Sequence, residues 1–328
     1  MKILRYFKNN KIKCGLLINE SDILNIENIE ISKSAKLNDH DNYIIENKLY
    51  NVEPIFLISL INKGAINFNN NYDKNSLIKL SDVEILSPIT KPNSFRDAYA
   101  FKQHVAAGRK ARNLPMIEEF DLNPVYYYSN HSAITGPGDL FFNKKHLNKL
   151  DFELELAIII GKEGKNIKVE NADDYIFGFM IMNDWSARDI QMNEMKLNLG
   201  PAKGKDFCTS IGPYLVTKDE LDAKTLRTNN GNIYDLNMSA YINDSKVSED
   251  TSKNMYWTFA QIISHISLGT TIYPGDIIGS GTCATGCLYE LNLTNNTNKW
   301  LQPNDNIKLQ IEQLGTLENI INLENDNE

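Results

Sequence analysis

Acidic side chains recur at every second residue at one point of the chain. Asp151, Glu153 and Glu155 occur in the run Asp-Phe-Glu-Leu-Glu, which continues into the apolar segment 156–160. On a β-strand, residues two apart share a face, so the three carboxylates would point the same way and repel one another. A hard divalent cation would offset this repulsion, because Mg²⁺ and Ca²⁺ prefer oxygen ligands. The solvent-facing side of an edge strand has the same pattern, so the spacing alone leaves both interpretations open.

A fourth carboxylate, Asp184, follows the apolar run Ile176–Met182 and precedes a segment of helical composition, 186–195. Arg188 and Gln191 are three residues apart and therefore project from one face of that helix. Binding residues gather where a strand ends and a helix begins. An aspartate that caps the helix beside an exposed arginine gives the same pattern, and taken alone that interpretation is the simpler one.

Two further segments contain residues that suit ligand binding. Lys205 follows Gly-Pro-Ala-Lys-Gly at 200–204, which resembles an anion-binding loop but lacks the spacing of a nucleotide-binding P-loop. Gly-Ser-Gly-Thr at 279–282 can offer backbone N–H groups and a hydroxyl to a ligand. Small residues in a tight turn explain the second segment equally well.

A histidine supplies a candidate general base. On a helix over Phe95–Arg112, Asp97 and His104 are two turns apart and therefore lie on one face. A histidine that is oriented by a carboxylate can act as a base near neutral pH. A single helical histidine is more often a surface or packing residue, so this pattern does not by itself establish a site.

The elements that must position these residues alternate without a regular βαβ order. We expect the first 85 or so residues to form short strands and hairpins, with a helix near 54–61. Beyond them we expect strands at 152–160, 176–182, 276–279 and 288–293, and helices at 95–112, 186–195 and 255–268. Many strands with interspersed helices predict an α+β fold that is mostly β. Prolines at 88 and 92 mark a boundary between a small β-rich domain at 1–88 and a larger domain at 89–328.

Composition excludes several functional classes. The 328 residues include 34 basic and 42 acidic side chains, giving a net charge of −8 and no run rich in Lys or Arg. This argues against nucleic acid as a partner, because phosphate neutralisation supplies most of that affinity. No apolar run approaches the roughly 20 residues that cross a bilayer, and the N-terminus is not a signal peptide. Four cysteines at these spacings predict buried reduced thiols in a cytoplasmic protein.

Taken together, the motifs resemble the fumarylacetoacetase (fumarylacetoacetate hydrolase) family over about Lys91 to Leu293. The resemblance rests on three motifs in order: Leu-Asp-Phe-Glu-Leu-Glu at 150–155, Met-Asn-Asp-Trp-Ser-Ala-Arg-Asp-Ile-Gln at 182–191 and Met-Tyr-Trp-Thr at 255–258. It implies a catalytic domain of mixed β-sandwich and β-roll type behind a small N-terminal β-rich domain. It also implies a homodimer.

The resemblance implies a role for each candidate residue. The metal ligands would be Asp97, Glu153, Glu155 and Asp184, holding Mg²⁺ as the first choice and Ca²⁺ or Mn²⁺ as alternatives. His104 would be the general base, paired with Glu290. The contacts to substrate and transition state would come from Arg188, Lys205 and Gln191, and the residues that position the substrate would be Tyr99, Arg112, Gln191 and Thr282.

The implied reaction is hydrolysis of a carbon–carbon bond between two carbonyls of a small anionic diketo acid. Fumarylacetoacetate and an acylpyruvate such as fumarylpyruvate are the expected substrates. The alternative is a lyase of the same superfamily that decarboxylates, hydrates or dehydrates 2-oxo acids. The segment 123–138 lacks the Tyr-His-Gly-Arg pattern of eukaryotic members. Met195 lies near the sequence position at which those enzymes have a substrate-contacting tyrosine. These departures leave the substrate open.

Overall fold

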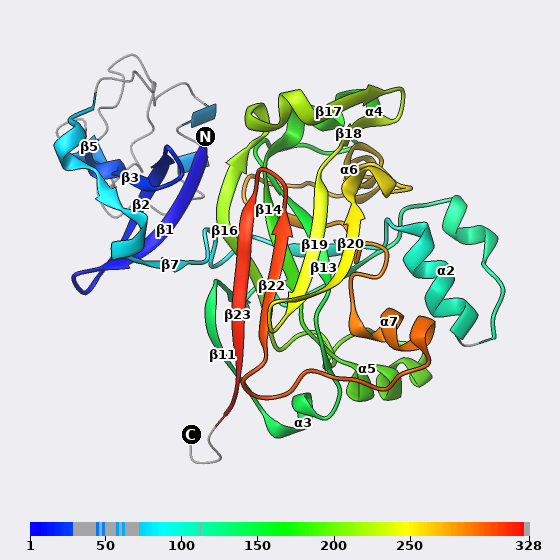
Figure 1. Cartoon of the computed structure of the whole chain (residues 1–328). Helices are drawn as coiled ribbons and strands as arrows, with labels where there is room; N and C mark the ends of the chain where they lie inside the picture. The colour runs from blue at the N-terminus through cyan, green and yellow to red at the C-terminus, as the bar shows by residue number, and fades with distance from the viewer. Residues whose placement is uncertain are drawn as a thin grey trace.

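The computed structural model describes residues 1–28, 72–111 and 113–324, with the short pieces 44–45, 48–49, 57–58 and 61–62. Within them, two β-sheets form the body of the molecule, and the smaller sheet lies in front of β13, β14 and β16 in Figure 1. The prediction of an α+β fold that is mostly β is confirmed. The predicted helix at 54–61 and Arg112 lie largely or wholly outside the described residues.

The larger sheet has twelve described strands in the order β6-β3-β2-β1-β16-β14-β13-β21-β8-β9, with β7 beside β1 and β10 beside β16. Its strands are β1 (Lys2–Lys8), β2 (Lys11–Ile18), β3 (Asp22–Asn25), β6 (Ile78–Lys79), β7 (Glu84–Leu86), β8 (Phe95–Ala98), β9 (Tyr126–Tyr128), β10 (Ile134–Thr135), β13 (Leu154–Ile160), β14 (Ile176–Asp184), β16 (Thr209–Thr217) and β21 (Ile277–Gly279). The central pair β13 and β14 is buried on both faces, as the continuous apolar runs predict.

The sheet continues across the predicted domain boundary at residue 88. β1 pairs antiparallel with β16, with Lys2 opposite Val216 and Ile3 opposite Leu215. Ile3 therefore shares a buried cluster with Ala157 of β13. The division into 1–88 and 89–328 stays a prediction.

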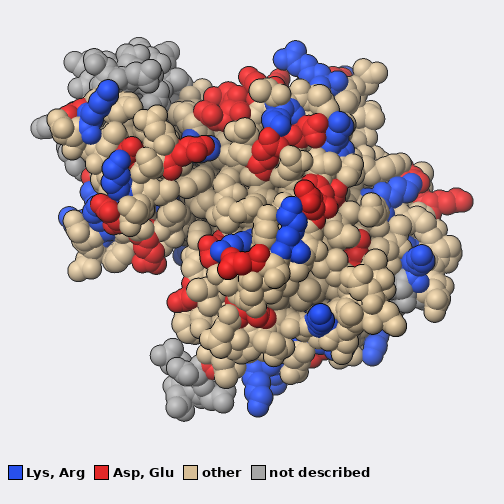
Figure 2. Space-filling model, in the orientation of Figure 1, with Lys and Arg blue, Asp and Glu red and all other residues tan. Residues whose placement is uncertain are grey.

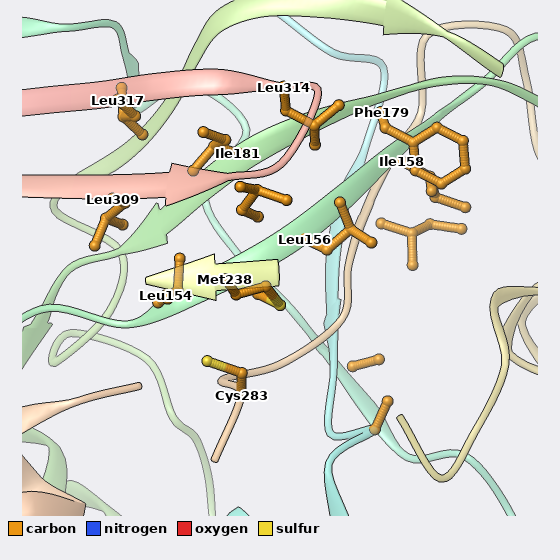
Figure 3. Close-up of a cluster of buried hydrophobic side chains, with 14 of the residues drawn as sticks. Leu154, Leu156, Ile158, Phe179, Ile181, Met238, Cys283, Leu309, Leu314 and Leu317 are labelled. Atoms are coloured by element: carbon orange, nitrogen blue, oxygen red, sulfur yellow. The ribbon is translucent and has the colours of Figure 1, made fainter. Parts of the chain in front are cut away.

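The second sheet covers one face of the first. Its order is β11-β23-β22-β19-β20, from the strands β11 (Gly138–Phe142), β19 (Asn237–Ile242), β20 (Ser245–Thr251), β22 (Asn306–Ile311) and β23 (Gly315–Leu323). Figure 3 shows the core between the sheets, where Leu156 and Ile181 face Met238 and Leu309. Burying such side chains stabilises the fold by about 1.5–3 kcal/mol each.

The helices lie outside the sheets. The α-helices whose full length lies in the described part of the chain are α2 (Lys102–Ala111), α3 (Lys144–Leu147), α4 (Val169–Ala172), α5 (Arg188–Glu194), α6 (Phe259–Ile266) and α7 (Leu288–Asn295). The described residues also form three two-stranded sheets: β12 (Leu150–Asp151) with β15 (Ser186–Ala187), β17 (Thr225–Thr228) with β18 (Gly231–Tyr234), and β4 (Ile44–Ile45) with β5 (Lys48–Leu49). In Figure 1, α2, α5 and α7 gather at one side of the body.

Two predicted elements are wrong in type over part or all of their length. The helix predicted at 95–112 is confirmed over Lys102–Ala111, but its first four residues form β8, because Phe95–Ala98 pairs with β21 on one side and β9 on the other. The strand predicted at 288–293 is the helix α7. Its alternating apolar residues suit a strand, but Cys287 Sγ accepts the Glu290 N–H and so caps the first turn of a helix.

Three predicted elements are correct in type but too long. The strand predicted at 152–160 is interrupted, because β13 begins only at Leu154. The helix predicted at 186–195 begins at Arg188, after the short strand β15. The helix predicted at 255–268 spans only Phe259–Ile266, because the side chain of Thr258 forms a capping box with Gln261 and fixes the first turn there.

The surface and thiols agree with the composition. On the face shown in Figure 2, acidic and basic side chains are interspersed. All four cysteines are described and buried, and none forms a disulfide, as predicted. No helix in the described part of the chain is long and apolar enough to span a bilayer.

Candidate active site

Four carboxylates converge at one end of the central strands. Asp97 lies on β8, Glu155 on β13 and Asp184 at the end of β14, while Glu153 lies one residue before β13. One oxygen of each carboxylate lies within 4.8 Å of the others, and all four residues are buried. The structure thus brings the four predicted metal ligands together. Their selection from the sequence rested on the motifs.

The residues of this acidic cluster fit a hard divalent cation. Glu155 Oε1 and Asp184 Oδ1 are buried without a hydrogen-bond partner among the described residues. Burial and the Asp184 carboxylate raise the pKa of Asp97 to about 8, and burial with Asp97 raises the pKa of Glu155 well above its usual value. Buried carboxylates that lack partners and repel one another are stabilised by a bound cation.

Two glycines allow the carboxylates to approach. A Cβ on Gly279 would come within 2.4 Å of Asp97 Oδ1 and 3.0 Å of Glu155 Oε2. Gly281 has φ +79°, and its N–H donates to the same two oxygens at 3.1 and 3.0 Å. The predicted ligand-binding turn at 279–282 therefore holds the acidic cluster in place.

Two cations border the acidic cluster. Lys205 Nζ lies 2.7 Å from Glu153 Oε2 and 2.6 Å from Asp184 Oδ2. Arg188 Nη2 donates to Glu153 Oε1 at 2.7 Å. Burial alone would raise the pKa of Glu153, but Lys205 and Arg188 outweigh it and hold that pKa well below its usual value. Glu153 is therefore a carboxylate even in the metal-free protein.

The predicted base and its partner meet beside the acidic cluster, where a ring nitrogen of His104 lies within 4.8 Å of a Glu153 oxygen. His104 on α2 and Glu290 on α7 are both buried, and His104 Nδ1 lies 2.7 Å from Glu290 Oε2. A carboxylate only accepts, so Nδ1 carries the proton in this hydrogen bond and Nε2 of the neutral ring is the acceptor. This is the arrangement of an oriented general base.

A cavity of about 300 Å³ opens beside these groups. The predicted residues that line it are Asp97, Tyr99, His104, Glu153, Arg188, Gln191, Lys205, Thr282 and Glu290. Glu155 and Asp184 are fully buried in the acidic cluster. The role of Arg112 stays a prediction, because that residue is not described.

Two residue placements differ from the sequence argument. Asp97 and His104 do not share a helix face: Asp97 is on a strand, and the chain turns between them. Asp151 does not join Glu153 and Glu155, because the strand is broken at Phe152 and Glu153. Its carboxylate binds Arg188 instead, with Nε to Oδ2 at 2.7 Å.

Sequence reasoning missed Tyr127. Its hydroxyl donates to Asp184 Oδ2 at 2.5 Å, and its ring lines the cavity. Burial and the Asp184 carboxylate raise its pKa well above the usual value, so it stays a donor. The pairing of Tyr127 with Asp97 across β9 and β8 places it there. The triplet of tyrosines at 126–128 was the only local signal, and the strand pairing was not readable from it.

Comparison with known proteins assigns the family. The profile described as fumarylacetoacetate (FAA) hydrolase C-terminal matches residues 93–322. A fumarylacetoacetase of Oryza sativa subsp. japonica is 32% identical over 298 residues, covering 72% of this chain and 67% of that protein. A fumarylacetoacetase of Arabidopsis thaliana is 38% identical over 172 residues, covering 44% of this chain and 41% of that protein. The chain therefore belongs to the fumarylacetoacetate hydrolase family and is an enzyme of that superfamily.

Solved structures share the fold. A fumarylacetoacetate hydrolase from Exiguobacterium antarcticum superposes with a TM-score of 0.72 at 24% identity, over 99% of this chain and 100% of that one. A maleylpyruvate hydrolase from Sphingobium gives 0.65 at 20% identity, and a probable 2-hydroxyhepta-2,4-diene-1,7-dioate isomerase from Mycobacterium abscessus gives 0.69 at 20%. Both cover 99% of this chain and 100% of their own. Hydrolases and isomerases thus share this architecture.

Proposed function

We propose that this protein is a metal-dependent hydrolase that cleaves a carbon–carbon bond in a β-diketone acid. The expected substrate is fumarylacetoacetate, cleaved to fumarate and acetoacetate, or an acylpyruvate such as fumarylpyruvate. One observation carries the proposal: the His104–Glu290 pair and the acidic cluster border the same cavity. The names of the plant relatives support the same reaction class.

Asp97, Glu153, Glu155 and Asp184 would hold the divalent ion, with Mg²⁺ as the first choice and Ca²⁺ or Mn²⁺ as alternatives. When bound, such an ion supplies Lewis-acid polarisation of carbonyl oxygens. The cluster carries up to four negative charges, so Lys205 and Arg188 keep the pocket attractive to an anionic substrate.

His104 is the residue that would activate water. Glu290 holds its Nδ1 proton, so Nε2 accepts the proton of a water molecule that attacks one carbonyl. Arg188, Lys205 and Gln191 line the same cavity, and their N–H groups would stabilise the oxyanion that forms. His104 would then return the proton to the carbanion that leaves.

Part of the cavity lining is apolar and suits an acyl chain. This part comprises Val125, Met192, Met195 and Pro201. Tyr99 packs edge-on against His104, with ring centroids 5.8 Å apart, and Thr282 lies on the lining as well. We propose that the diketone half of the substrate faces the acidic cluster and the acyl half faces Met195.

The second candidate is a lyase that acts on 2-oxo acids. The acidic cluster favours it, because a chelated 2-oxo acid needs no activated water to lose or gain a group at its neighbouring carbon. The His104–Glu290 pair favours hydrolysis, since the activation of water is what an oriented histidine does.

A substrate panel separates the two candidates. Purified protein, stripped with EDTA and reloaded separately with Mg²⁺, Ca²⁺ or Mn²⁺, would be incubated with fumarylacetoacetate, acylpyruvates and oxaloacetate. The expected result is metal-dependent cleavage of a diketo acid into two acids, identified by chromatography. Release of CO₂ from oxaloacetate without cleavage of any diketo acid would contradict the hydrolase and support the lyase.

Family membership also supports proposals about the oligomeric state, the cellular compartment and the pathway. We propose a homodimer in the cytoplasm that acts in aromatic amino acid catabolism, such as tyrosine degradation. Light scattering would test the dimer, since a mass near twice that of the chain is expected and a monomer would contradict it.

A further inference from the structure

A buried aspartate lies behind the cavity and touches two parts of the catalytic centre. Asp151 is fully buried and is not one of the described residues that line the cavity. Its Oδ2 accepts from Arg188 Nε at 2.7 Å and lies 2.7 Å from Nη2 of the same guanidinium. Nε and Nη2 form one edge of the guanidinium, and a buried carboxylate oxygen that contacts both of them fixes the plane of the group.

The same carboxylate holds the start of α7. Oδ1 accepts the N–H of Leu288 at 2.7 Å, and Oδ2 accepts the N–H of Tyr289 at 2.9 Å. The first N–H groups of a helix have no partner within the helix, and negative charge is favourable there. Glu290 follows directly, so Asp151 sets where the partner of His104 stands.

The remaining N–H groups of Arg188, which lines the cavity, are also held by hydrogen bonds. Nη2 donates to Glu153 at 2.7 Å and Nη1 to Gln191 Oε1 at 3.1 Å. The backbone adds to this anchoring, since β12 pairs with β15 and the Arg188 N–H donates to the carbonyl of Lys149 at 3.0 Å. Without Asp151, the guanidinium could turn wholly toward Glu153.

We propose that Asp151 is a positioning residue that couples Arg188 to the His104–Glu290 pair. It does not touch the substrate. It holds the guanidinium and the first turn of α7 in one hydrogen-bonded unit, so that the oxyanion contact and the base keep a common geometry. The proposal rests on the proposed function for the roles of Arg188 and His104.

Double-mutant cycles test this coupling. Asp151→Asn keeps the size of the side chain but removes its charge and one acceptor oxygen. We expect kcat to fall about 10- to 100-fold with KM within about threefold, as displaced catalytic groups cost. In the Arg188→Gln background, and separately in the Glu290→Gln background, the further loss should be at least about fivefold smaller. A full, multiplicative loss in either background would overturn the coupling.

A binding measurement keeps the test independent of turnover. Oxalate is a planar dianion that mimics an enolate, and its binding to the Mg²⁺-loaded protein can be measured by calorimetry. Asp151→Asn should weaken it about tenfold in the wild type and less than twofold in Arg188→Gln. Coupling in oxalate binding with no hydrolysis of any diketo acid would reject the proposed function and keep the positioning role. Hydrolysis of a diketo acid without coupling in either measurement would support the proposed function and reject the positioning role.

Asp276 offers a matched control. It is also buried, accepts from the Ser94 hydroxyl at 2.7 Å and the Tyr273 N–H at 2.9 Å, and lies 3.7 Å from Arg96, away from the cavity. Asp276→Asn should lower the Tm to a similar degree and leave kcat within about twofold. If it lowers kcat as much as Asp151→Asn does, general destabilisation explains both and the positioning role is wrong.

Discussion

The two sides of the cavity differ in how well their polar groups are satisfied. On the strand side, Glu155 Oε1 and Asp184 Oδ1 are buried with no partner among the described residues. On the helix side, Arg188 and Glu290 are held by hydrogen bonds of 2.7 Å, Arg188 to Asp151 and Glu290 to His104. The strand side therefore leaves buried oxygens that a cation could satisfy, whereas the helix side is preorganised by the chain alone. Changes on the strand side should alter metal binding most, and changes on the helix side should alter turnover while leaving metal affinity nearly unchanged.

The largest effect is expected from Glu155→Gln. Glutamine keeps an oxygen for the Gly281 N–H but removes a charge from the acidic cluster. We expect divalent-ion affinity to fall at least about 100-fold and kcat/KM about 10⁴-fold, because Lewis-acid stabilisation is worth several kcal/mol. Calorimetric titration with Mg²⁺ measures the first. Asp173 also has a buried oxygen without a described partner but lies outside the cluster, so Asp173→Asn should leave affinity unchanged. Retained Mg²⁺ affinity in Glu155→Gln would contradict the metal site.

His104→Ala is the corresponding change on the helix side. We expect kcat to fall about 10²- to 10³-fold, the usual contribution of a general base, with Mg²⁺ affinity within about threefold. Steady-state kinetics and a metal titration on the same preparation check both values. His146 stacks on Phe207, and His146→Ala should keep full activity. A fully active His104→Ala variant would contradict the proposed mechanism.

The pH dependence of stability should separate the two sides without any substrate. The folded, metal-free protein keeps a proton on Asp97 up to a pKa of about 8, whereas the unfolded chain releases it near 3.8. Since the folded state then binds more protons, this contribution to stability is complete below about pH 3.8 and is lost as the pH rises through 8.

Mg²⁺ should reverse that loss, because the bound ion takes the place of the proton. At about 100 times its Kd, an ion that binds only the folded state adds about 2.7 kcal/mol of stability. Scanning calorimetry at pH 6, 7 and 8 should show a larger rise in Tm on adding Mg²⁺ at pH 8 than at pH 6. Asp97→Asn should reduce this difference without removing it, because the pKa of Glu155 is raised as well. A rise in Tm that is equal at all three values would show that the cluster carboxylates are already ionised.

The smallest effect is expected at Met195, an apolar residue of the cavity lining. Met195 lines the cavity and is 38% exposed, so truncating it to alanine removes only part of a buried side chain. We expect KM for a long-chain acylpyruvate to rise about 3- to 10-fold with kcat within about twofold. Leu197 is 80% exposed and does not line the cavity, so Leu197→Ala should change neither. An unchanged KM in Met195→Ala would place the acyl chain elsewhere.

The strand side was the more predictable from sequence. The apolar runs of β13 and β14 predict buried strands, and an acidic residue beside such a run is a candidate site residue. On the helix side, the prediction that Arg188 and Gln191 share a helix face agrees with the structure, since Nη1 donates to Oε1 there. These signals are local, and local periodicity depends little on the rest of the chain.

The elements that carry Asp97 on the strand side and Glu290 on the helix side were less predictable, because contacts with distant segments decide them. Asp97 was placed on a helix, but pairing of β8 with β21 and β9 made it part of a sheet. Glu290 was placed on a strand, but the capped first turn made it part of a helix. The motif resemblance named both residues as site candidates, and both line the cavity, although the local elements predicted around them were wrong.

The amino-acid sequence by itself determined the mostly β character of the fold and the membership of the family, and it indicated the candidate residues of the site. Only the tertiary structure decided that Asp151 leaves the carboxylate series to hold Arg188, and that Tyr127 reaches Asp184. The physical reason is that residue type and period are local properties. Which donor finally meets a buried carboxylate depends on contacts between segments far apart in the chain, such as Asp151 and the first turn of α7.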